Sequence, residues 1–366
     1  MLRALRSLIY WLPMIMLMGC SDEPISHLDY LQSIKKIDIH FHTRGDADYL
    51  RSLLDDLNMK VCTMCTRGVD PVYTNKQIDS AREITKQYPR YYAWATTFDL
   101  STRDEPHYAE RVIEKLGRDF NDGALGVKVW KEIGMEIKNP QGEYIQLDDP
   151  MFTPIFEFIA EQGKTVFSHI GEPIQAWMPN HIGPDGKETG YWAKHPEFSF
   201  WDKPGVPSYE EIMAARDHVI ARHPNLRMVG CHLGSLEIDV DEIAKRLDRY
   251  PNFAVEIGGR TRYFMAQARD KVRKFFLKYQ DRIMYGTERN GGNMGRDSKS
   301  ATQEQIDDAT RSMMERHDQF FRYFATDEEM EWDYYTVRGL ALPTDVLKKV
   351  FYDNAVKWAP GVEQAY

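Results

Sequence analysis

The fold is decided by a short stretch near the N-terminus, IKKIDIHFHTRGD (Ile34–Asp46). Its isoleucine-rich first half is typical of a β-strand and predicts one over residues 36–42. The strand ends in His40 and His42, which share one face because alternate residues of a strand point the same way. A turn containing glycine follows at once. The meaning of this strand end depends on whether other strands of the chain end in polar residues too.

Further β-rich runs follow along the chain, and amphipathic helical segments separate them. Several of these segments have acidic residues near their start and Gly or Pro just past their end, as helix termini prefer. The expected strands are residues 36–42, 60–66, 91–98, 124–130, 165–170, 227–233, 253–259 and 282–288. The expected helices are residues 46–58, 75–88, 107–120, 150–163, 208–224, 237–251, 265–280 and 343–360. This alternation predicts a single-domain α/β fold, the closed parallel (β/α)8 TIM barrel.

Two connections are longer than ordinary loops. Residues 171–207 follow the fifth expected strand, and residues 289–342 follow the eighth. Long loops at the carboxyl ends of barrel strands usually build or cover an active site. We therefore expect both segments at the rim of the barrel.

Composition limits the class of protein and of partner. The chain has 366 residues, a formal net charge of −9 and 42% hydrophobic residues, enough for a large core. An acidic chain without a basic block argues against nucleic acid as a partner, because phosphate binding needs clustered Lys and Arg. We expect a small-molecule substrate instead. The sequence leaves open whether the chain forms a homo-oligomer.

The first residues have the features of an export signal. Arg3 and Arg6 precede an apolar run over Leu8–Leu17 that is too short to span a bilayer comfortably. The ending LMGC resembles a bacterial lipobox, which would make Cys20 a lipidated residue; the alternative is an ordinary signal peptide with a chance cysteine. We therefore expect a signal peptide over residues 1–19, a lipidated N-terminus and tether over 20–35, and the barrel domain over 36–366. The expected location is the cell envelope, with the protein anchored to a membrane.

Polar residues end several other strands of the predicted barrel. In a barrel, the carboxyl ends of the strands meet at one rim, where such enzymes place their chemistry. Imidazoles and a carboxylate gathered in a pocket suit a divalent transition metal, with zinc as the default. The strand-end residues are His40, His42, Lys128, His169, His232 and Glu288.

The order His-x-His, Lys, His, His, acid resembles the amidohydrolase superfamily of metal-dependent hydrolases. Stretches such as HPEFSFW and CHLGSLEIDVDEIAKRLDRYPNFAVEIGGR are similar to the amidohydrolase-related branch, which includes lactonases and non-oxidative decarboxylases. The resemblance implies that His40, His42 and His169 bind the metal and that His232 lies beside it or binds a second one. It also implies a carboxylate on the eighth strand that binds metal and shuttles protons, here Glu288.

Glu288 departs from the pattern, because the family acid is usually Asp. The longer side chain still binds metal after a small backbone shift, acts only as a base through water, or leaves the site impaired. Lys128 is also ambiguous: it is a carboxylated lysine bridging two metals, or a lysine that anchors substrate or a carboxylate such as Glu256. A bare ammonium beside a metal cation would be repelled.

Three further residues are expected to bind substrate. Arg260, after the seventh strand, could hold a substrate carboxylate, or it could be a surface or helix-capping residue. Trp130 and Glu172 lie in or beside rim loops and could line the pocket or pack the loops.

The first functional hypothesis is hydrolysis of a small lactone, ester or amide by a metal-activated water, with Glu288 as base and His232 stabilising the oxyanion. The second is non-oxidative decarboxylation or hydration of a small carboxylic acid that Arg260 would hold. The third is an envelope barrel protein whose metal site is impaired.

The lipobox generates the first testable prediction. Cys20→Ala should release the protein from membranes, because the acyl chains would have no attachment point. Fractionation of cells into membrane and soluble proteins measures this. A wild-type protein found entirely in the soluble fraction would contradict lipid anchoring.

Overall fold

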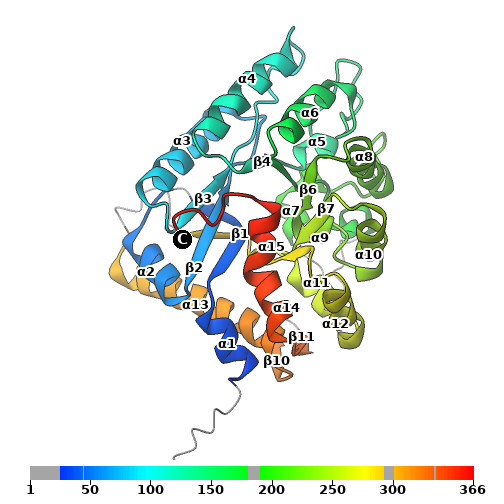
Figure 1. Cartoon of the computed structure of the whole chain (residues 1–366). Coiled ribbons are helices and arrows are strands. Elements are labelled where there is room, and N and C mark those ends of the chain that lie inside the picture. The colour runs from blue at the N-terminus through cyan, green and yellow to red at the C-terminus, as the bar shows by residue number, and fades with distance from the viewer. Residues whose placement is uncertain (1–24, 44, 180–189, 292–300, 334) are drawn as a thin grey trace, which may run out of the picture.

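Eight parallel strands form the centre of the protein in the computed structural model, which describes residues 25–366 except 44, 180–189, 292–300 and 334 (Figure 1). Each expected strand is present, although most are shorter than the sequence pattern predicts. The strands are β1 (Lys36–Thr43), β2 (Met59–Met64), β3 (Tyr92–Ala95), β4 (Gly126–Val129), β5 (Thr165–Ser168), β6 (Arg227–Gly230), β7 (Phe253–Glu256) and β8 (Ile283–Met284).

Helices surround these strands (Figure 1). The helices that alternate with the strands are α2 (Asp48–Asp56), α3 (Pro71–Gln87), α4 (Tyr108–Asn121), α6 (Thr153–Glu161), α8 (Tyr209–Arg222), α10 (Val240–Arg249) and α12 (Arg269–Lys278). The expected closing helix is α14 (Thr344–Lys348), a π-helical turn over Lys349–Asp353, and α15 (Asn354–Trp358). Additional elements are α1 (His27–Ser33), α5 (Glu132–Met135), α7 (Tyr191–Lys194), α9 (Cys231–Gly234), α11 (Thr261–Met265), α13 (Gln303–Ala325), β9 (Arg289–Gly291), β10 (Glu329–Trp332) and β11 (Tyr335–Arg338).

The strands form two parallel sheets, and backbone hydrogen bonds of flanking residues connect these sheets on both sides. The strand orders are β3-β2-β1-β9 and β4-β5-β6-β7-β8. Between β3 and β4, the amide of Thr96 donates to the carbonyl of Gly126 at 2.9 Å. On the other side, the amide of Ile39 donates to Tyr285 O at 3.1 Å, and that of Glu288 donates to His40 O at 2.6 Å. The predicted TIM barrel is confirmed. The bond from the Glu288 amide to His40 O also connects two candidate site residues directly.

The core has an inner and an outer part. The larger cluster lies between the strands and the surrounding helices, as expected for strands covered on both faces. The smaller one joins inward side chains, such as Ile39, Phe167 and Met284, to Trp358 of α15. The Thr165 hydroxyl donates to Trp358 O at 2.5 Å, which holds α15 against the start of β5. The closing helix therefore covers the end of the barrel at which the strands begin, opposite the carboxyl ends of the strands.

The segment expected as a lipidated N-terminus and tether, residues 20–35, contains a helix in its described part. Residues 27–33 form α1, which is capped by Ser26, and Leu31 is fully buried. The buried Lys36 ammonium donates to Leu31 O at 2.9 Å and to Ile34 O at 2.7 Å, and so satisfies carbonyls at the C-terminal end of the helix. Burial lowers the pKa of Lys36 to about 8. The folded domain thus begins before β1.

Within the described part of the segment after β8, the long helix packs on the barrel wall, whereas β9 pairs with the end of β1 at the rim. The long helix, α13, begins with a capping box formed by Thr302 and Gln305, and it packs against α1 and α2 (Figure 1). His317 on this helix is buried and lies 2.7 Å from the Tyr285 hydroxyl, next to β8. The expectation that this segment covers the active site is therefore wrong for α13. The loop after β5, in contrast, does reach the pocket.

The predicted signal peptide and Cys20 lie outside the described residues. Within the described ranges, no helix has both the length and the apolar character needed to cross a bilayer.

The packing of α1 generates the second prediction. Leu31→Ala should lower the free energy of unfolding by about 2–5 kcal/mol, because it leaves a cavity in a packed core. Denaturant unfolding measures this, with the exposed Ser33→Ala on the same helix as the control. An unchanged stability for Leu31→Ala would mean that α1 is not part of the folded domain.

Candidate metal centre

The two histidines of β1 are oriented by acceptors on two other strands, β7 and β2. His40 Nδ1 lies 2.8 Å from Glu256 Oε1, and His42 Nδ1 lies 3.0 Å from Met64 O. Each Nδ1 therefore carries the proton, and each Nε2 presents a lone pair. Burial would raise the pKa of the Glu256 carboxyl, but His40 beside it outweighs this effect, and the pKa falls to about 2. Glu256 thus remains an anion that fixes the ring of His40.

A bulge on β1 aims these side chains. The register between β1 and β2 shifts between Asp38 and Phe41, and such bulges commonly re-aim side chains next to active sites. Asp38 Oδ1 accepts hydrogen bonds from the amides of His40 and Thr287, both at 3.1 Å. The Thr287 hydroxyl donates to Asp38 Oδ2 at 2.5 Å. One buried carboxyl thus holds the end of β1 to the segment that carries Glu288.

His169, His232 and Glu288 form the second half of the site. His169 directly follows β5, whereas His232 lies beyond the end of β6 in α9, with a φ of 56°. The Nδ1 of His232 bonds to Gly258 O at 2.6 Å. Its Nε2 lies 3.0 Å from His169 Nδ1 and 3.1 Å from Glu288 Oε1. Glu288, also in the left-handed region at φ 55°, therefore reaches the histidines across the barrel.

The electrostatics of the site favour neutral imidazoles and an ionised carboxylate. Burial lowers the pKa of His42 to about 3 and holds that of His169 well below its usual value, with nearby charged groups adding to the effect. Burial opposes ionisation of Glu288, but the neighbouring His232 holds its pKa well below the usual range. Neutral imidazole and carboxylate are the forms that bind a metal ion.

The donor atoms fit a divalent cation. His40, His42 and Glu288 form one group and His169, His232 and Glu288 another, and within each group the ligand atoms lie within 4.8 Å of one another. Nitrogen and carboxylate ligands of this kind suit zinc and similar ions. The groups share Glu288, so the arrangement offers positions for one ion or two.

A third group, of His40, Cys231 and Glu256, meets the same distance criterion but is a poorer site. Burial raises the pKa of the Cys231 thiol to about 12, so the thiol stays protonated. The carboxylate of Glu256 is already bound to the Nδ1 of His40.

Lys128 lies at the same centre. It is fully buried on β4, and its Nζ is 3.0 Å from His40 Nε2 and 3.1 Å from Cys231 Sγ. In this arrangement the ammonium uses the lone pair that His40 would offer to a metal. An ion bound by His40 therefore requires Lys128 to move away or to lose its positive charge.

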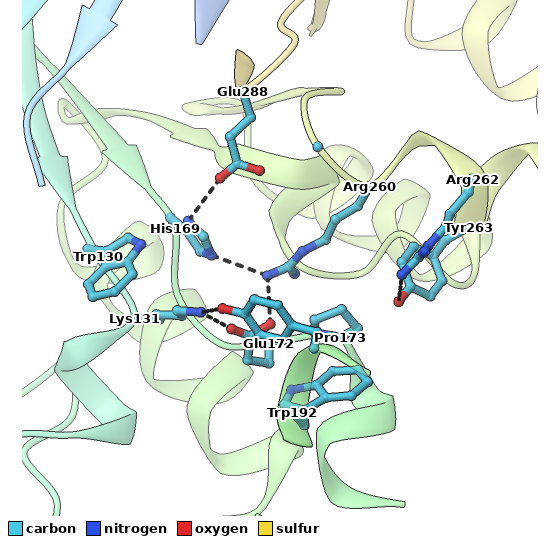
Figure 2. A pocket seen from close by; sticks show the side chains of 12 residues that line it. Trp130, Lys131, His169, Glu172, Pro173, Trp192, Arg260, Arg262, Tyr263 and Glu288 are labelled. Atoms are coloured by element: carbon cyan, nitrogen blue, oxygen red, sulfur yellow. Dashed lines mark hydrogen bonds and ion pairs between the residues drawn. The ribbon is translucent and has the colours of Figure 1, made fainter. Parts of the chain in front are cut away.

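A cavity of about 290 Å³ opens beside His169 and Glu288 (Figure 2). It brings together the three expected substrate-binding residues: Trp130, Glu172 and Arg260. Arg260 is buried, and its Nη2 donates to His169 Nε2 at 3.2 Å. It is therefore not a surface residue, and it contacts a residue of the candidate centre.

Sequence reasoning missed other residues of the cavity. Lys131 and Tyr191 line it, and the Lys131 ammonium donates to the Tyr191 hydroxyl at 2.8 Å. The sequence held a signal for Lys131, a charged residue two positions after an apolar strand. Gly259 also lines the cavity: a Cβ there would lie 2.0 Å from Glu288 Oε2, so glycine leaves room for the longer acid. Nothing in the local sequence pairs Gly259 with Glu288.

Comparison with known protein families identifies the group. The family model described as amidohydrolase matches residues 37–358. The chain belongs to the amidohydrolase family. No curated protein matches the chain. The family assignment agrees with the resemblance read from the strand ends, and it supports an enzyme.

Solved structures of this fold are similar to the chain over most of its length. The 2,6-dihydroxybenzoate decarboxylase from Rhizobium is 14% identical, with a TM-score of 0.51 over 88% of this chain and 98% of that one. A complex of 2,6-dihydroxybenzoate decarboxylase with 2,6-dihydroxybenzoate gives a TM-score of 0.50 at 14% identity, over 88% and 98% of the two chains. The 5-carboxyvanillate decarboxylase from Novosphingobium aromaticivorans, complexed with manganese, is 15% identical over 89% and 96%, with a TM-score of 0.49. The two dihydroxybenzoate decarboxylase structures confirm the fold.

The contact between Gly259 and Glu288 generates the third prediction. Gly259→Ala should push the carboxylate away from His232 and weaken divalent-metal binding by roughly tenfold, within the coupling range of about 0.5–3 kcal/mol for residues in contact. In a Glu288→Asp background the shorter acid avoids the new methyl group, so the added loss should be small. The strain of alanine at φ +72° is common to both backgrounds and cancels.

Chelator competition measures the metal affinity of the four proteins in this cycle, and circular dichroism checks their folding. Equal losses in both backgrounds would show that Gly259 does not act through Glu288.

Proposed function

We propose that the protein is a metal-dependent hydrolase that acts on a small lactone, ester or amide. The observation that carries this proposal is the 3.1 Å contact between Glu288 Oε1 and His232 Nε2, next to His169 and at the inner end of the cavity. This pair places a proton acceptor and an imidazole beside a donor set that fits a divalent cation. We take zinc as the ion, because imidazole and carboxylate are common zinc ligands.

A bound divalent cation supplies Lewis acidity, which lowers the pKa of water and polarises a carbonyl group. Glu288 accepts the proton of the attacking water and later delivers it to the leaving alcohol or amine. His232 donates its Nδ1–H to Gly258 O, so only its Nε2 is directed at the reaction. With a second proton on Nε2, the imidazolium donates to the substrate oxygen and stabilises its negative charge. The aromatic rings of Trp130 and Trp192 line the cavity that receives the substrate.

A second candidate is non-oxidative decarboxylation of a small carboxylic acid. The feature that favours it is the pair of cations Lys131 and Arg260 on a wall that also carries aromatic rings (Figure 2). Such a wall can hold an aromatic carboxylate. Both cations, however, already contact Glu172.

We also propose that the chain works at the cell envelope, held to a membrane through Cys20. The support is the sequence LMGC after a basic and apolar start.

The fourth prediction tests the reaction. The purified protein, loaded with zinc or manganese, should hydrolyse members of a panel of lactones, esters and amides, while carboxylic acids in the same panel release no carbon dioxide. Glu288→Gln keeps the side-chain volume and removes the base, so turnover should fall by about two or more orders of magnitude.

Elemental analysis of Glu288→Gln separates loss of the base from loss of the ion. Unchanged turnover in this variant would refute the role of Glu288. Carbon dioxide release from an acid, without hydrolysis of any panel member, would establish the second candidate instead.

A further inference from the structure

Glu172 occupies the wall of the cavity between two cations. It follows β5 and is 4% exposed. One carboxylate oxygen forms an ion pair with the Lys131 ammonium, and the other lies 3.4 Å from Arg260 Nη2 (Figure 2). A carboxylate held by an ammonium on one side and a guanidinium on the other is the arrangement in which a protein binds an acidic ligand. Here the protein itself provides the acid.

Lys131 has little capacity left for a ligand. It is 3% exposed, and besides Glu172 it donates to the Tyr191 hydroxyl at 2.8 Å. Its ammonium also lies 3.7 Å from the centre of the Phe198 ring. This cation–π contact stabilises the positive charge of Lys131 in addition to the ion pair with Glu172.

Arg260 is committed in the same way. Its Nη1 donates to Ser235 Oγ at 3.2 Å and to Glu237 Oε1 at 3.4 Å. Its Nη2 is shared among His169 Nε2, Gly171 O and Glu172 Oε2, at 3.2–3.4 Å. The charge of Arg260 is therefore balanced from two sides, and a substrate carboxylate would have to displace a buried partner.

The rest of the cavity is largely aromatic, and its other cation, Arg262, lies over the Tyr263 ring, 5.0 Å from the ring centre. Trp130, Trp192 and Tyr263 contribute rings to its lining, and a volume of about 290 Å³ accommodates a compact ring. The carboxylate of a ligand would need the position between Lys131 and Arg260, which Glu172 already occupies. Two carboxylates at one site repel each other. An uncharged group of the same shape meets no such repulsion.

We propose that Glu172 is a specificity-determining residue: it fills the anion position between Lys131 and Arg260 and so selects uncharged, ring-containing substrates over the corresponding acids. This rests on the proposed function, since it narrows the substrates of that reaction to neutral lactones, esters and amides. Specificity of this kind comes from disfavouring the wrong ligand as well as from binding the right one.

The fifth prediction compares two probes of nearly equal shape, benzoate and benzamide, on the full metal-loaded protein. Isothermal titration gives the Kd of each probe for the wild type and for Glu172→Gln, which keeps the shape of the side chain and removes its charge. The ratio of the benzoate Kd to the benzamide Kd should fall at least tenfold in the variant, with the benzamide Kd nearly unchanged. Binding of benzoate directly to the metal affects both proteins and cancels in this comparison.

Glu197→Gln is the matched control, because it removes the same charge from an exposed residue of the same loop, paired with His195 at 3.2 Å. Its ratio should equal that of the wild type. An unchanged ratio in Glu172→Gln, or an equal change in Glu197→Gln, would overturn the proposal.

A second variant and a second measurement keep the proposal testable if Glu172→Gln is less stable, because Lys131 and Arg260 lose a charged partner in that variant. In Glu172→Ala, which also removes the side-chain volume, benzoate should raise the Tm more than benzamide does, because a ligand that binds the folded state stabilises it. Melting curves insensitive to benzoate would overturn the proposal. Both measurements report binding and not turnover, and chromatography of the samples checks that each probe is intact, so failure of the hydrolase assay and failure of this binding test are distinguishable.

Discussion

The site depends on one buried carboxylate, that of Glu256 at the end of β7. Its Oε1 accepts from His40 Nδ1 at 2.8 Å and from the amide of His232 at 2.7 Å, and its Oε2 accepts from the amide of Gly258 at 2.6 Å. These bonds connect β1, β6 and the turn after β7. They orient the candidate ligand His40 on β1 and hold the backbone of His232, the proposed oxyanion partner, in α9 just after β6. An anion with its acceptor sites satisfied in this way can remain ionised inside a barrel.

Much of the architecture could be predicted from the sequence, because strand periodicity and turn residues are local signals and the barrel brings strand ends to one rim. His40, His42, Lys128 and His169 lie where their strand positions place them. The positions of His232 and Glu288 could not be derived in the same way. Both follow their strands and have a left-handed backbone conformation, which no residue pattern in the sequence predicts. The bulge in β1 depends on pairing with β2 and was equally hidden. Contacts between distant loops, such as that of Glu172 with Lys131 and Arg260, carry no sequence signal at all.

The longer acid at position 288 is accommodated by the chain around it. Gly259 leaves the space that the additional methylene needs, and the carbonyl of Gly258 orients the histidine that the acid contacts. The departure from the usual Asp is therefore matched by its surroundings and does not leave the carboxylate out of reach of the imidazoles. The effect of Glu in place of Asp therefore depends on the backbone opposite it. The position of the carboxylate is set both by the length of the side chain and by the residues that the side chain contacts.

The position of α1 determines how the protein would be oriented on a membrane. This helix leads into the start of β1, whereas the cavity lies at the carboxyl ends of the strands, at the opposite end of the barrel. Between Cys20 and Ile25 the chain spans at most roughly 20 Å. A protein held at Cys20 would therefore stand on a membrane with its closed end down. The mouth of the cavity would face the surrounding solution, so that substrates would arrive by diffusion through water and not from within the lipid.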